Sequence, residues 1–181
     1  VRVDELYKKD VKGLIGVRGL GVKLLVEMVK PKIDPFSSEN PLIFATGPIN
    51  GLIFPGASRV GVFFKSPLTG IFGESYCGGY FAPQMKFAGY DVIIVYGTSK
   101  KPVYLTVFDE DIKIKDGSHL WGKDTFETED NIKSDEGRGF EDVRFQYPID
   151  SGRADLVILL PDHKPLLLIE CRRKLDVAGG S

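Results

Sequence analysis

Apolar residues recur along the chain in short runs, and their spacing predicts both helices and strands. Residues 5–29 have the three-to-four-residue spacing of helices, interrupted by Gly16, Gly19 and Gly21. We therefore expect two short helices hinged at these glycines. Three prolines within residues 30–41 then end the helical pattern.

Most of the following apolar runs predict strands, because they are rich in β-branched and aromatic residues and are bounded by Gly, Pro or Ser. They occupy residues 42–47, 60–65, 90–97, 102–109 and 112–116. The last three are joined by short polar links and predict an antiparallel meander. A helix is expected from near Thr125, since acidic residues follow in its first turn.

The pattern changes at residues 134–142, a charged stretch without periodicity that we interpret as a linker. Beyond it, three further strands are predicted at residues 143–149, 154–160 and 165–173. The sequence thus predicts an α+β fold of antiparallel sheets with a few short helices, in three parts. These are a domain of residues 1–133, the linker of residues 134–142, and a small β-rich tail of residues 143–181.

Charge and cysteine content narrow the function classes. The 24 basic and 25 acidic side chains nearly cancel, which argues against a global nucleic-acid-binding surface. The two cysteines, Cys77 and Cys171, lie far apart, which favours a reducing compartment, and the cytoplasm is expected. The sequence contains no apolar run that is long enough to predict a membrane span and no segment that predicts a secretory signal. The sequence does not predict an oligomeric state. Because the first residue is Val1 and not Met, we expect a fragment or a processed form of a longer protein.

Eight of the 21 glycines fall between residues 51 and 91, near Arg59 and Lys65. Consecutive glycines such as Gly78 and Gly79 let another group approach the main chain, and a guanidinium and an ammonium group both bind phosphate. The segment therefore predicts either an anion-binding platform or a set of tight turns. No Walker or dinucleotide-binding spacing decides between them.

Several long motifs indicate a protein family. "RGLGVKLL", "DPFSSENPLIFATGPINGLIFPGASRVGVFFKSPLTG", "SYCGGYFAPQMKFAGYDVIIVYG", "KPVYL" and "DGSHLWGKDTFETED" occur in this order. Together they resemble the N-terminal domain of the tungsten-containing aldehyde ferredoxin oxidoreductase family, over roughly residues 1–133. The resemblance implies an incomplete copy of an α+β domain that forms the base for a bis-pterin tungsten or molybdenum cofactor.

The resemblance also implies roles for individual residues. Arg59, in the segment "ASRVGV", is expected to contact a cofactor phosphate, and Gly78, with Gly79 beside it, to line the pterin. Tyr76 stands where the family commonly has an asparagine associated with the Mg²⁺ that joins the pterin phosphates. A phenol is a poor Mg²⁺ ligand, so Tyr76 is expected to contribute main-chain contacts at most.

In the family, an aldehyde is oxidised to a carboxylic acid, and electrons leave through a 4Fe-4S cluster to ferredoxin. The set of cysteines that holds this cluster is absent from the sequence, so the chain alone is expected not to turn over aldehydes. Cys77 is expected to be a small packed side chain, and no residue is assigned to a metal. His119, next to Trp121, is expected to be structural.

The tail suggests an alternative. "GRADLVI" and "PLLLIECRR" resemble the PD-(D/E)xK nuclease core of restriction-enzyme R subunits. If the two runs form a hairpin, Asp155 and Glu170 lie close together as Mg²⁺ ligands, with Arg172 at the position of the catalytic lysine and DNA as partner. Arginine does not readily lose a proton. The remaining alternatives are a plain hairpin and a catalytically inactive chimeric or truncated chain.

Overall fold

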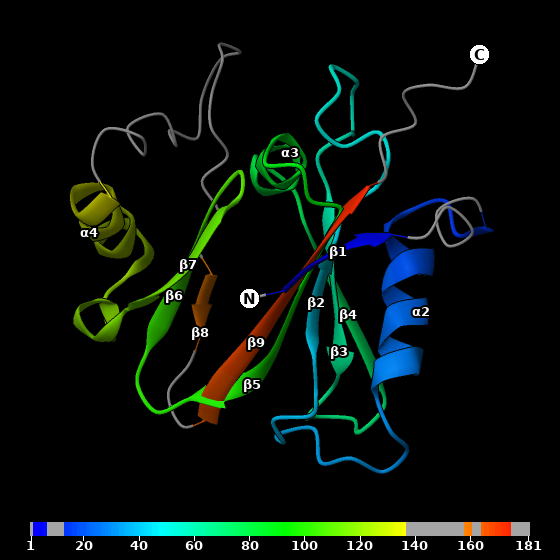
Figure 1. Ribbon diagram of the computed structural model, residues 1–181, viewed down its shortest axis with the longest axis horizontal. Coiled ribbons are helices and arrows are strands. Elements are labelled where there is room, and N and C mark those ends of the chain that lie inside the picture. The colour runs from blue at the N-terminus through cyan, green and yellow to red at the C-terminus, as the bar shows by residue number, and fades with distance from the viewer. Residues whose placement is uncertain (1, 7–12, 137–157, 161–163, 175–181) are drawn as a thin grey trace.

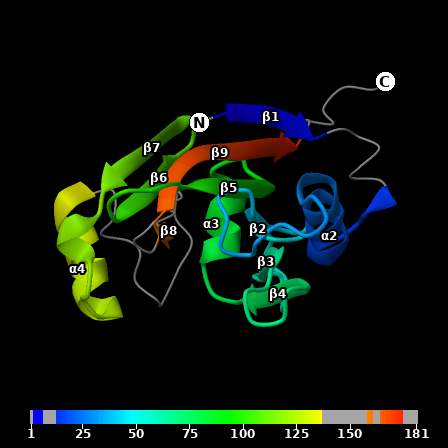
Figure 2. The ribbon, with the colours of Figure 1, turned by 90° about the horizontal axis from the view of Figure 1, so that it is seen from below.

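The computed structural model describes residues 2–6, 13–136, 158–160 and 164–174, with side chains for residues 13–136 (Figure 1). It has the expected α+β fold, built from two sheets and a few short helices. The helical elements are α2 (Val17–Met28), α3 (Phe81–Phe87), the 3-10 turn η1 (Ser118–Leu120) and α4 (Thr125–Glu136). Figures 1 and 2 place α2 and α4 at opposite ends of the molecule.

Nine strands are described, in two sheets. They are β1 (Arg2–Leu6), β2 (Leu42–Ala45), β3 (Val60–Lys65), β4 (Phe72–Cys77), β5 (Val92–Ser99), β6 (Val103–Phe108), β7 (Asp111–Asp116), β8 (Ile158–Leu160) and β9 (Lys164–Lys174). The first sheet has the order β1-β9-β5-β2-β3-β4, and the second has the order β7-β6-β8. β9 pairs antiparallel with β5 and parallel with β1, so the first and last described strands are neighbours.

Strand β5 lies at the centre of the hydrophobic core because both of its faces are buried. Ile93 and Val95 pack on one side, against α3 and strands β6 and β7. Val92 and Ile94 point to the other side, toward α2 and β3. Such burial on two faces explains the nearly unbroken apolar run in this strand.

Helix α2 packs unusually close to β3, and glycines on both elements make this possible. A Cβ atom added to Gly21 would lie 2.2 Å from the Phe63 ring, and one added to Gly61 would lie 2.4 Å from Val17. Gly19 and Gly21 lie inside the continuous helix α2. The hinge that was expected between two helices is therefore not found at these two positions. Residues 5 and 6 of the predicted helical region belong to β1 instead.

Three further predictions differ from the structure. β5 pairs with β2 and β9, so only β6 and β7 of the predicted meander pair with each other. The glycine segment contains a strand and a helix, β4 and α3, which its composition did not indicate. β8 and β9 belong to different sheets, so the hairpin expected in the tail is not formed. The run at residues 143–149 lies outside the described residues.

Candidate phosphate-binding site

Arg59 lies directly before β3, and its side chain is exposed. Among the residues with described side chains, no carboxylate forms an ion pair with its guanidinium. The β3–β4 ladder ends with Val60 opposite Cys77. Arg59 directly precedes Val60 and Gly78 directly follows Cys77, so the predicted arginine and glycine pair lie at the same end of this ladder.

Gly78 and Gly79 border open space. A Cβ atom added at either position would meet no atom within 4 Å, and both residues are exposed. Gly79 has φ +85°, a conformation that side-chain-bearing residues rarely adopt. A ligand can therefore approach this main chain without displacing protein atoms. Exposed glycines beside a guanidinium that has no carboxylate partner among the described side chains suit a phosphate-bearing group.

Asn50 braces the loop between β2 and β3 that leads to Arg59. Its side chain is buried, with the residue only 5% exposed. The Gly47 N–H donates to Asn50 Oδ1 at 2.5 Å, while Asn50 Nδ2 donates to the carbonyls of Ala57 and Arg59, both at 3.1 Å. Asn50 is not among the site residues predicted from the sequence. The only local signal is an asparagine in the glycine- and proline-rich stretch "GPING", which is typical of any turn.

The Tyr76 side chain is engaged with other side chains of the protein. Its hydroxyl donates to Glu74 Oε2 at 3.0 Å, and its ring meets the Phe63 ring edge-to-face with centroids 6.1 Å apart. Partial burial, together with the Glu74 carboxylate, raises the pKa of Tyr76, so the phenol stays protonated near neutral pH. The phenol oxygen is thus engaged with Glu74, which leaves the main chain as the part of Tyr76 that borders the glycines.

Lys65 lies at the other end of β3, about 20 Å from Arg59 along a strand of this length. Its ammonium group donates to the Ile33 carbonyl at 2.7 Å. The hypothesis that Lys65 and Arg59 bind one anion together is therefore wrong. Of these two basic residues, only Arg59 lies at the end of the β3–β4 ladder where Gly78 and Gly79 follow β4.

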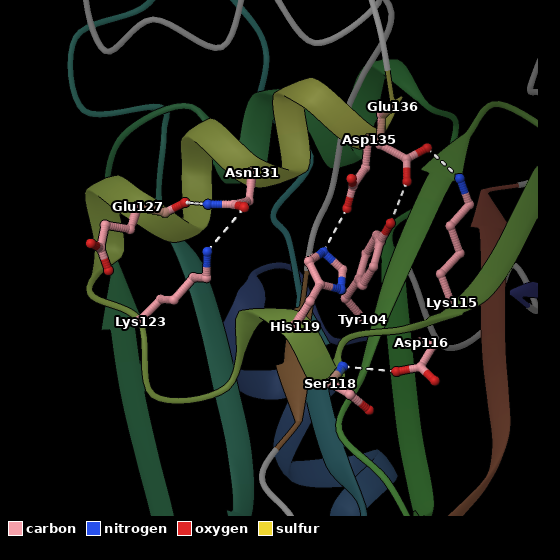
Figure 3. A network of polar contacts seen from close by, with 10 residues as sticks. All are labelled: Tyr104, Lys115, Asp116, Ser118, His119, Lys123, Glu127, Asn131, Asp135 and Glu136. Atoms are coloured by element: carbon pink, nitrogen blue, oxygen red, sulfur yellow. Dashed lines mark hydrogen bonds and ion pairs between the residues drawn. The ribbon is translucent and has the colours of Figure 1, made fainter.

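The structure also describes His119 and Cys77, which were both expected to have structural roles. His119 Nε2 lies 2.7 Å from Asp135 Oδ2 and ties the η1 turn to the end of α4 (Figure 3). Cys77 is exposed instead of packed, and its thiol donates to the Gly78 carbonyl at 3.1 Å. Within the described residues, no group of three or more His, Cys, Asp or Glu side chains could hold a metal ion.

Of the three residues of the nuclease alternative, Asp155 lies outside the described residues, and only the main chain of Glu170 and Arg172 is described. Glu170 and Arg172 belong to β9, where Glu170 is opposite Ile94 of β5 and Arg172 is opposite Val92. Their side chains are not described, so their roles stay predictions.

No described helix is long and apolar enough to span a membrane.

Comparison with known proteins identifies the family. The model of the aldehyde ferredoxin oxidoreductase N-terminal domain matches residues 1–145. The chain belongs to this family. The matched residues include the predicted domain of residues 1–133 and the predicted linker of residues 134–142. The match stops short of Glu170, and nothing in the comparisons supports a nuclease-like tail.

Members of the aldehyde ferredoxin oxidoreductase family are close in sequence to this chain. It is 45% identical over 137 residues to the tungsten-containing aldehyde ferredoxin oxidoreductase of Pyrococcus furiosus, covering 76% of the chain and 23% of that relative. The aliphatic sulfonate oxidoreductase WOR-like subunit of the same organism is 35% identical over 125 residues, covering 67% of the chain and 20% of that protein. The chain thus spans about a quarter of the length of these relatives.

A solved structure has the same fold. The active-site complex BamBC of benzoyl coenzyme A reductase, bound to 1,5-dienoyl-CoA, superposes with a TM-score of 0.70 at 40% sequence identity. The match covers 72% of this chain and 20% of that one. Fold and family therefore agree with the α+β oxidoreductase domain expected from the motifs.

Proposed function

We propose that this chain contributes part of the surface that binds a pterin tungsten cofactor in an enzyme that oxidises aldehydes to carboxylates. The observation that carries the proposal is an exposed guanidinium, Arg59, with no carboxylate partner among the described side chains, beside glycines with open space above them. Tungsten in the names of the relatives supports the choice of cofactor. We propose tungsten, and not molybdenum, as the metal for this reason.

In this function, Arg59 binds a phosphate of the cofactor through its planar fork, and Gly78 and Gly79 allow the rest of the group to lie against the main chain. The redox chemistry of aldehyde oxidation is supplied by such a cofactor when it is bound. The protein contributes binding, orientation and charge neutralisation. The Mg²⁺ that joins the phosphates is not assigned to Tyr76, because that phenol donates to Glu74.

Aldehyde and ferredoxin are the proposed substrate and electron acceptor of the complete enzyme, by analogy with the names of the relatives. The chain matches only 23% of such a relative, and no cysteine set for a 4Fe-4S cluster occurs in its sequence. The chain alone is therefore proposed to bind the phosphates without turnover. Reduction of a viologen dye by the purified chain with an aldehyde would contradict this.

A direct test measures phosphate affinity. Inorganic pyrophosphate, used as the probe, is titrated into the ¹⁵N-labelled chain, and the amide signals of Gly78 and Gly79 are followed by NMR. Arg59→Ala is expected to weaken binding by about tenfold or more, because a charged bidentate contact is lost. Arg18→Ala is the matched control, since Arg18 is also exposed but is paired with Glu74 at 2.9 Å. Equal affinity of the Arg59 and Arg18 variants would refute the proposed site.

A second measurement addresses the metal. The chain is produced in medium with tungstate or molybdate and then analysed for both elements. Under the proposal, retained metal is lost with Arg59→Ala and kept with Arg18→Ala. Retention that does not depend on Arg59 would place the metal elsewhere on the protein.

A further inference from the structure

We infer that Asn50 is a positioning residue for phosphate binding: it holds the end of the β2–β3 loop so that Arg59 stands beside Gly78 and Gly79. This inference rests on the proposed function. Asn50 uses both ends of its amide, accepting from the Gly47 N–H and donating to the carbonyls of Ala57 and Arg59. One of the groups that it holds is the main chain of the binding arginine itself.

The other hydrogen bonds of this loop do not perform that task. Within residues 47–57, the main-chain bonds join neighbours no more than three positions apart, such as Asn50 N–H to Gly47 at 3.2 Å and Ala57 N–H to Phe54 at 3.1 Å. These bonds form local turns. The β2–β3 ladder brings the two ends of the loop together as far as Ala45, opposite Gly61, and no described main-chain bond crosses the loop beyond that pair. The Asn50 side chain connects the start, at Gly47, to the end, at Ala57 and Arg59.

The outward side chains of the loop add little restraint. Four apolar side chains of the loop are at least half exposed: Ile49, Leu52, Ile53 and Phe54. Since they bury little apolar area against the described fold, they contribute little packing that would fix the loop. Beyond the β2–β3 ladder, the buried amide of Asn50 therefore makes the described side-chain hydrogen bonds that order this segment before a ligand arrives. A preordered loop binds more tightly because less conformational entropy is lost on binding.

The opposite end of β3 supplies a built-in control. There, Asn40 Nδ2 donates to the carbonyls of Pro35 and Lys65 at 2.8 and 2.9 Å, and the Lys65 N–H donates to Asn40 Oδ1 at 3.0 Å. This is also an asparagine that makes three main-chain bonds next to a cation. The Lys65 ammonium group, however, is bonded to the Ile33 carbonyl. Loss of the Asn40 brace removes the same kind of interaction about 20 Å from the proposed site.

The test compares Asn50→Ala with Asn40→Ala in the pyrophosphate titration. Both variants are expected to unfold at lower temperature, because each leaves three main-chain groups without their side-chain partner. Only Asn50→Ala is expected to raise the dissociation constant for pyrophosphate, by about fivefold or more, while Asn40→Ala changes it by less than about twofold. Equal dissociation constants in the two folded variants would overturn the inference.

A double-mutant cycle separates positioning from general destabilisation. In the Arg59→Ala background, Asn50→Ala is expected to change the remaining affinity by less than about twofold, because Asn50 acts through Arg59. A full additional loss in that background would show that Asn50 does not act through the arginine. If Asn50→Ala does not fold, Asn50→Ser replaces it, since a hydroxyl fits the buried site and keeps at most part of the brace.

The same data distinguish failure of this inference from failure of the proposed function. If Arg59→Ala binds pyrophosphate as well as the unmodified chain does, there is no phosphate contact to position, and both proposals are refuted. If Arg59→Ala weakens binding but Asn50→Ala does not, the phosphate site stands and the role of Asn50 is refuted.

Discussion

The two sheets carry charged groups in different ways. Beside the three-stranded sheet, Tyr104 and Lys115 both contact Glu136, and His119 contacts Asp135, so α4 is fastened by paired polar groups (Figure 3). At the end of β3 in the six-stranded sheet, the Arg59 guanidinium has no described carboxylate partner, and the neighbouring glycines leave space open. Both regions contain candidate chemical groups, yet only the second leaves such groups available to a ligand.

This difference separates structural polar groups from binding groups. A buried carboxylate that accepts from a tyrosine and a lysine stabilises the fold, and removing it leaves its partners unsatisfied. An exposed cation without a partner contributes little to stability, and its removal is felt in ligand binding instead. The free energy of unfolding of single variants therefore distinguishes structural polar groups from binding groups.

The largest effect is expected from Glu136→Ala. It leaves the buried Tyr104 hydroxyl without its acceptor, 2.6 Å away, and removes the partner of Lys115, so the free energy of unfolding should fall by about 2–3 kcal/mol. Urea denaturation measures this. The control is Glu129→Ala on the same helix, which loses only a pair one turn away, with Lys133, and should cost about 0.5 kcal/mol or less. Equal losses would contradict a special role for the Glu136 contacts.

The next effect concerns the closed part of the six-stranded sheet. Gly21→Ala should lower the free energy of unfolding by about 2 kcal/mol, because the new methyl group would lie 2.2 Å from the buried Phe63 ring. Gly19→Ala, in the same helix, meets Leu14 at an ordinary 3.5 Å and should instead stabilise by about 0.5–1 kcal/mol. Thermal or urea unfolding of the pair decides, and stabilisation by both would rule out the close packing of α2 on β3.

A smaller effect depends on pH. Burial, with the Glu136 hydrogen bond, raises the pKa of Tyr104 above that of an unfolded tyrosine, about 10. The stability supplied by the protonated hydroxyl is therefore complete below pH ~10 and declines as the pH rises from there toward the higher pKa of the folded state. Tyr104→Phe should cost about 1 kcal/mol near neutral pH and show a shallower decline above pH ~10. Urea titrations from about pH 8 to 11 compare the two slopes; identical slopes would refute the coupling.

The smallest effects on stability are expected where the molecule is open. Arg59→Ala and Gly78→Ala should each change the free energy of unfolding by no more than about 0.5 kcal/mol. The first removes a cation without a carboxylate partner among the described side chains, and the second adds a methyl group to open space. Gly79→Ala is a useful contrast, because φ +85° strains alanine and should cost about 1 kcal/mol. Losses at Arg59 as large as those at Glu136 would erase the distinction between the two regions.

The sequence was sufficient for the parts of the fold that depend on local pattern. β2, β3, β7 and the start of α4 lie where apolar runs and acidic first-turn residues indicated. β4 was missed because four of its six residues are exposed and it lacks a clear alternation. α3 was missed because seven residues are too few to establish a helical period.

The remaining differences come from contacts distant in sequence. Gly21 resembles a hinge in isolation, and only the position of Phe63 explains it as a packing glycine. The proposed site shows the same limit: family motifs pointed to Arg59, Gly78 and Gly79, whereas Asn50 depends on where three main-chain groups lie after folding. The sequence also grouped Lys65 with Arg59, although a whole strand separates them.

The position of β9 has a consequence for how the protein is made. β1 contacts the six-stranded sheet through β9, which follows it by more than 150 residues. A ribosome adding about 5–20 residues per second needs roughly 10–30 s to reach that point. β1 thus leaves the ribosome well before the strand that hydrogen-bonds to it, and during that interval its edge is open to chaperones or to other nascent chains.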